Sequence, residues 1–68
     1  MTIHLNGAPR EVAEEATVAS VLALLEVSTA SRGVAVAVDR EVLPRGRWEQ
    51  TRLRAGARLE VLSATQGG

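Results

Sequence analysis

Two residue types that carry much of covalent catalysis are absent from this 68-residue chain. It has no Cys, and because all eight of its basic residues are Arg it has no Lys either. It therefore cannot form a disulfide or a thiolate metal site, and it offers neither a thiolate nucleophile nor a Schiff-base amine. Its only imidazole, His4, has no ligand cluster or triad partner evident in the sequence. We expect a protein that is not an enzyme and binds no metal or cofactor.

Aromatic residues and net charge are also scarce. The chain has one Trp, no Tyr and no Phe, and its formal net charge is +0. Nucleic-acid binding draws on a basic excess and on aromatic stacking, so nucleic acid is not an expected partner. The N-terminal segment lacks a signal-peptide pattern, and no apolar run approaches the roughly 20 residues of a membrane helix. We expect a cytoplasmic protein that does not associate with membranes.

The residues that are present suit one small globular domain, which begins with a strand. Apolar residues make up 46% of the chain and charged residues 24%, a balance typical of soluble domains. Residues 2–5 alternate polar and apolar, which predicts a strand with Ile3 and Leu5 inward and His4 on the solvated face. The following Asn-Gly pair predicts a type I′ turn into a second strand over 8–13, where Pro9 favours a sheet edge.

Residues 17–27 have the pattern of a helix. Thr17 is a suitable N-cap, and the apolar residues at 18, 21, 22 and 25 share one helical face, so we predict a helix over about 18–27. Ser20 stands where a capping box would have Glu or Gln, and we therefore expect the single Thr cap rather than a reciprocal pair. Residues 27–33, which are rich in Ser and Thr, are expected to form the exit loop.

Three further strands follow. Residues 33–38 alternate Val with Ala, which predicts a strand that has small side chains on one face. A turn at 39–40 and a short strand over 41–43 come next, and Pro44 can open a helical turn that packs Trp48 against the domain. Residues 58–62 alternate cleanly, with Leu59 and Val61 inward and Leu62 on the outer face.

These elements predict an α+β fold for residues 1–62, with a mixed sheet of four to five strands and one main helix. The first and last strands can be parallel neighbours because the helix lies in the crossover between them. A β-grasp arrangement satisfies this order.

Residues 63–68 are expected to form a flexible C-terminal tail, because they are all small or polar and end in Gly67-Gly68. Six extended residues span roughly 20 Å, so the tail can carry Gly68 into a partner's active site. The glycines lack a Cβ, which lets the backbone follow Gln66 through a narrow channel and leaves the Gly68 carbonyl unhindered. A free carboxylate is a poor electrophile, so Gly68 must be activated by another protein, for example by adenylation.

The chain resembles the ThiS family, the ubiquitin-like sulfur carriers of thiamine biosynthesis, over essentially its whole length. The most specific stretch is 43–48 (Leu-Pro-Arg-Gly-Arg-Trp). The other matching stretches are 3–7 (Ile-His-Leu-Asn-Gly), 17–18, 33–42 and 66–68 (Gln-Gly-Gly). Two turn positions depart from the family pattern: Asp39 stands where Asn is common, and Ala57 stands where Asp is common.

The resemblance implies a function for the last residue. A ThiF-like adenylating enzyme would activate Gly68 with ATP, and a donor such as a cysteine desulfurase would supply sulfur. The resulting thiocarboxylate would pass its sulfur to a ThiG-like thiazole synthase. ATP would be used by the adenylating enzyme and not held by this chain.

Three other functions remain open from the residues. The chain could carry sulfur for molybdopterin or another metabolite, act as a ubiquitin-like modifier that joins Gly68 to a target Lys, or be a β-grasp interaction module whose tail is idle. One residue of the body is a candidate partner contact in any of these cases. Leu62 is an apolar residue on a charged strand face, immediately before the tail.

Overall fold

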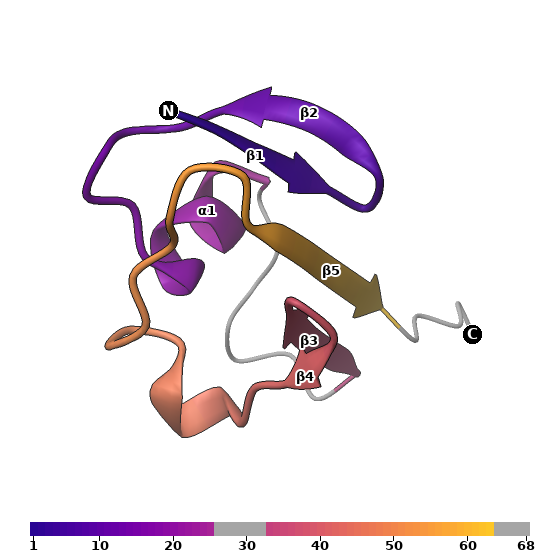
Figure 1. The fold of residues 1–68 in the computed structure, drawn as a ribbon. Coiled ribbons are helices and arrows are strands. Elements are labelled where there is room, and N and C mark those ends of the chain that lie inside the picture. The colour runs from indigo at the N-terminus through magenta and orange to yellow at the C-terminus, as the bar shows by residue number, and fades with distance from the viewer. Residues whose placement is uncertain (26–32, 64–68) are drawn as a thin grey trace.

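The computed structural model describes residues 1–25 and 33–63, and within them five strands form one mixed sheet (Figure 1). The sheet order is β2-β1-β5-β3-β4, in which β1 and β5 are parallel and the other pairs are antiparallel. A 3-10 turn, Arg45–Arg47, follows β4. The elements of the sheet and the single described α-helix are β1 (Thr2–Leu5), β2 (Ala8–Glu11), α1 (Val18–Leu24), β3 (Val34–Val38), β4 (Glu41–Val42) and β5 (Arg58–Ser63).

The first hairpin has the predicted turn. Asn6 and Gly7 have φ values of 50° and 88°, the left-handed backbone that a type I′ turn requires. β2 is an edge strand, as predicted, but it ends at Glu11 and not at residue 13. Pro9 pairs with His4, whose backbone N–H donates to Ala57 O at 2.8 Å on the other side of β1. The backbone of Pro9 therefore faces the open edge, where its missing N–H breaks no ladder hydrogen bond.

The second hairpin turns at Asp39 and Arg40, which have φ values of 51° and 75°. Asp tolerates this left-handed region better than most residues do, and this accounts for Asp or Asn at position 39. The strand after the turn is shorter than predicted, because β4 ends at Val42. Leu43 nevertheless continues the pairing, since its N–H donates to Val36 O at 2.8 Å.

The helix begins as predicted but is capped differently. Thr17 Oγ1 accepts the Ser20 N–H at 3.1 Å, and Ser20 Oγ accepts the Thr17 N–H at 2.9 Å. The prediction of a single cap was therefore wrong, because a Ser hydroxyl at this position reaches back and completes the capping box. The described helix ends at Leu24, and the last residues of the predicted helix and the exit loop lie within 26–32, outside the described residues.

One cluster of buried side chains joins the helix to the inner face of the sheet. Trp48 is 2% exposed, its Nε1 donates to Leu43 O at 3.0 Å, and the Arg45 guanidinium lies 4.8 Å from its ring centroid. The predicted packing role of Trp48 is thus confirmed. The buried residues are Ile3, Val12, Ala16, Val18, Val21, Leu22, Val36, Trp48, Leu53, Ala57 and Leu59.

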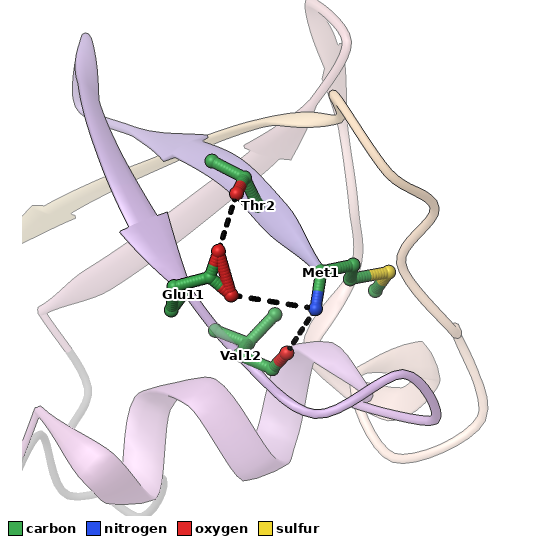
Figure 2. Close-up of polar contacts among 4 residues, drawn as sticks. All are labelled: Met1, Thr2, Glu11 and Val12. Atoms are coloured by element: carbon green, nitrogen blue, oxygen red, sulfur yellow. Dashed lines mark hydrogen bonds and ion pairs between the residues drawn. The ribbon is translucent and has the colours of Figure 1, made fainter.

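The N-terminal residues are tied to the end of β2 (Figure 2). The Met1 amine donates to Val12 O at 2.7 Å and lies 3.5 Å from Glu11 Oε1, while Thr2 Oγ1 donates to Glu11 Oε2 at 2.6 Å. The hydrogen bond from Thr2 and the charge of the amine lower the pKa of the Glu11 carboxyl. These contacts tie β1 to the sheet-edge strand at the start of the chain.

Candidate functional site

The residues expected to react lie at the end of the chain. Gln66, Gly67 and Gly68 fall outside the described residues, so their roles remain predictions. The base of the predicted tail is described, and there β5 runs on to Ser63, one residue beyond the predicted strand. Leu62, the predicted partner contact, is 70% exposed and lies on the outer face as expected.

The predicted tail follows the central strand of the sheet. β5 pairs with β1 through His4↔Arg58 and Leu5↔Leu59, and with β3 from Val38↔Leu59 to Val34↔Ser63. Because β1 and β5 are parallel, the C-terminal end of β5 lies at the same end of the sheet as the β1–β2 turn (Figure 1). A strand paired on both sides is a fixed base for whatever segment follows it.

One half of the outer sheet face is apolar. Ala35 pairs with Leu62, and Ala37 pairs with Val42, so these four side chains share the face opposite the core. Val42 and Leu62 are 80% and 70% exposed, and the four residues together with Glu60 line a shallow hollow. We call Ala35, Ala37, Val42 and Leu62 the outer apolar patch. Its two Ala residues are the small side chains expected on this strand, and they leave room between Val42 and Leu62.

The other half of the outer face is polar. His4 and Arg58 are register partners on β1 and β5, and together with Gly7 and Glu60 they line a second shallow hollow. His4 is exposed, as predicted. Within 1–25 and 33–63, no group of three or more His, Cys, Asp or Glu side chains is placed to hold a metal ion. Nor has any helix in those ranges the length and hydropathy needed to span a membrane.

Side chains of the two hairpin turns hold β5 near its two ends. Asp39 Oδ1 accepts the Arg58 N–H at 3.0 Å at the start of the strand. Asn6 reaches Val61 near the other end, where its Oδ1 accepts the Val61 N–H at 2.9 Å and its Nδ2 donates to Val61 O at 3.3 Å. Both turn residues have positive φ, and each adds a side-chain contact to the hydrogen bond that its own backbone N–H donates to β5.

Sequence analysis missed two features of this site. Val42 was assigned only to a strand, and its place beside Leu62 follows from the order of strands in the sheet, which the sequence does not display. Asn6 was recognised only as a turn residue. Its contact with Val61 joins residues 55 positions apart, and only the parallel pairing of the first and last strands pointed toward that contact.

Comparisons with known proteins agree on one family. The sequence model of the ThiS family matches residues 3–68. A crystal structure of the thiamine biosynthesis protein ThiS from Geobacter metallireducens is 33% identical, with a TM-score of 0.81 and full coverage of both chains. An NMR structure of a thiamine biosynthesis protein from the same organism is 34% identical, with a TM-score of 0.83, and covers 100% of this chain and 88% of that one. No curated protein sequence gives a significant match.

Proposed function

The chain belongs to the ThiS family and has its ubiquitin-like β-grasp fold, and we propose that it is a sulfur carrier of thiamine biosynthesis that reacts at Gly68. The observation that carries this proposal is the match of the family over 3–68, which takes in Gln66, Gly67 and Gly68. The described body supports it, because the tail is attached to the central strand beside the outer apolar patch. The chain itself supplies no catalytic group and binds no cofactor in this proposal.

The proposed reaction begins at the Gly68 carboxylate. One of its oxygens attacks the α-phosphorus of ATP in a ThiF-like adenylating enzyme, pyrophosphate leaves, and an acyl adenylate forms. A sulfur nucleophile then attacks the activated carbonyl carbon, and AMP leaves with that oxygen. If the sulfur arrives as a persulfide from a cysteine desulfurase, a thiol must reduce the S–S bond to release the thiocarboxylate. The product then donates its sulfur to a ThiG-like thiazole synthase.

The chain's part in this reaction is to present an unhindered carbonyl. Gly67 and Gly68 have no Cβ, so the backbone can occupy a narrow channel without a steric penalty. Gln66 precedes them as the last residue with a side chain. Because an ionised carboxylate resists nucleophilic attack, the energy for the step comes from ATP in the partner.

The outer apolar patch is the proposed contact with these partners. Leu62 lies one residue before the end of β5, so a protein bound over the patch is beside the point where the tail begins. Exposed apolar side chains gathered on one face contribute binding energy when a partner removes them from water. The polar half of the outer face, which includes His4 and Arg58, lies to the side of this contact.

Intact mass spectrometry tests the proposal. We would incubate the protein with ATP, a cognate adenylating enzyme and a sulfur donor, and we expect a species about 16 Da heavier, the difference between sulfur and oxygen. The matched control is the chain that lacks Gly68, which should stay unchanged. An unchanged mass for the full chain would refute the sulfur-carrier function.

The same assay separates the alternatives. A ubiquitin-like modifier would appear joined to a larger protein through an amide bond, whereas an interaction module would bind its partner equally well without Gly67 and Gly68. Transfer of the sulfur to thiazole synthase, measured against transfer to a molybdopterin-forming enzyme, decides between metabolites.

A further inference from the structure

The Asn6 side chain extends the sheet beyond the last residue of β1. Along the parallel pair, the His4 N–H donates to Ala57 O at 2.8 Å and the Asn6 N–H donates to Leu59 O at 2.9 Å. The next donor in this series would come from residue 8, but the chain has already turned into β2. Asn6 Nδ2 takes that donor's place on Val61 O, at 3.3 Å.

The acceptor side of the ladder is replaced in the same way. In a parallel ladder the Asn6 carbonyl would accept the Val61 N–H. Its backbone turns away at a φ of 50°, and Asn6 Oδ1 accepts that N–H at 2.9 Å. One amide side chain therefore satisfies both backbone groups of Val61, because its carbonyl oxygen accepts and its NH₂ group donates.

We propose that Asn6 is a positioning residue for the reaction at Gly68, an inference that rests on the proposed function. On the β1 side, backbone pairing ends at Leu59, and the Asn6 side chain moves the last point of attachment to Val61. β3 holds the alternate residues of β5, since Asp39 N–H donates to Arg58 O at 2.8 Å and Leu62 pairs with Ala35. Asn6 thus fixes the second edge of β5 immediately before the tail.

The size of the effect follows from the two hydrogen bonds of the Asn6 side chain. β3 pairs with β5 as far as Val34↔Ser63, so removal of that side chain releases only the β1 edge of Val61. The two lost hydrogen bonds should raise local opening of this edge, each by about twofold to tenfold. We expect the rate of Gly68 activation to fall at least twofold, with no change in docking.

The test compares Asn6→Gly with Asp39→Gly. Both substitutions remove a turn side chain that accepts a backbone N–H of β5, and both keep a residue that tolerates positive φ. The variant at position 6 loses the attachment beside the tail, whereas the variant at 39 loses one at the far end of the strand. Three quantities are measured for each: amide exchange at Val61, kcat and KM for adenylation by a cognate enzyme, and the melting temperature.

The proposal expects faster Val61 exchange and a lower kcat in Asn6→Gly at unchanged KM, and a normal kcat in Asp39→Gly. Asn6→Asp keeps the acceptor and loses the donor, so its kcat should lie between those of wild type and Asn6→Gly. An unchanged kcat in Asn6→Gly, or equal losses of kcat in both Gly variants, would overturn the positioning role alone. A wild-type chain that is never adenylated would instead overturn the proposed function, and this role with it.

Discussion

The substitution Leu62→Arg tests whether the outer apolar patch binds the adenylating enzyme. Leu62 is 70% exposed, so less than a third of its surface contributes to the free energy of folding. Because full burial of a Leu side chain is worth about 1.5–3 kcal/mol, its loss here should cost below about 1 kcal/mol of stability. In a partner interface the same side chain becomes buried, and an Arg there would be desolvated without a counter-charge. We expect affinity to fall by about tenfold or more, since tenfold corresponds to about 1.4 kcal/mol.

His4→Arg is the matched control for this experiment. His4 is also exposed on the outer face, but it lies on β1 in the polar half, so the same guanidinium is placed outside the patch. Affinity is measured by titration calorimetry against the adenylating enzyme, and stability by thermal unfolding of each variant. Normal affinity in Leu62→Arg would refute the docking role of the patch. Equal losses in both variants would show that added positive charge, and not the loss of the apolar contact, is responsible.

Three further predictions address the tail, the N-terminal contacts and the helix start. Gly67→Val should abolish thiocarboxylate formation and leave the melting temperature nearly unchanged, because it adds bulk beside the reacting carbonyl; pyrophosphate exchange and a melting curve measure the two effects, and full exchange activity would contradict the steric argument. Glu11→Gln should remove part of the stability loss at acid pH. The depressed pKa of Glu11 gives stability above the unfolded pKa of about 4.3, which is lost as pH falls through the folded pKa. Melting temperatures of the two proteins should therefore converge from pH 6 to pH 3, and a constant difference would exclude this carboxylate as the cause. Ser20→Ala should lower stability by about 0.5–1.5 kcal/mol, or roughly 2–12 °C, whereas Ser20→Gln restores an acceptor for Thr17 N–H; equal melting temperatures for wild type and Ser20→Ala would show that the capping box contributes nothing.

The sequence was sufficient for the order of elements because the local signals agree with the final packing. The Asn6-Gly7 turn, the Thr17 cap and the edge position of Pro9 depend on neighbouring residues, and the structure confirms all three. The misjudged cap at Ser20 is also local, and it came from treating Glu and Gln as the only suitable partners. Strand ends were less predictable, since the last hydrogen bonds beyond β2 and β4 depend on where β1 and β3 lie and not on the local sequence.

The candidate site depended more on long-range pairing. Leu62 was identified because its apolar character breaks an alternating strand, but Val42 becomes its neighbour only through Ala35 and Ala37 on the strand between them. The spacing of apolar residues along the sequence does not show which two strands lie on either side of a third strand in the sheet. The strand order of the sheet therefore decides which exposed apolar residues form one surface.

The position of β5 predicts that the stability of the fold and the proposed reaction at Gly68 can be changed separately. Among its inward-facing residues, Leu59 is 0% exposed and belongs to the core, Val61 is half-buried and Ser63 is exposed. The inner face of the strand thus leaves the core over its last residues. Asn6 holds the strand at Val61, between Leu59 and Ser63. Substitution of the buried Leu59 should act mainly on stability and substitution of the exposed Leu62 mainly on partner reactions, whereas loss of Asn6 should register in both.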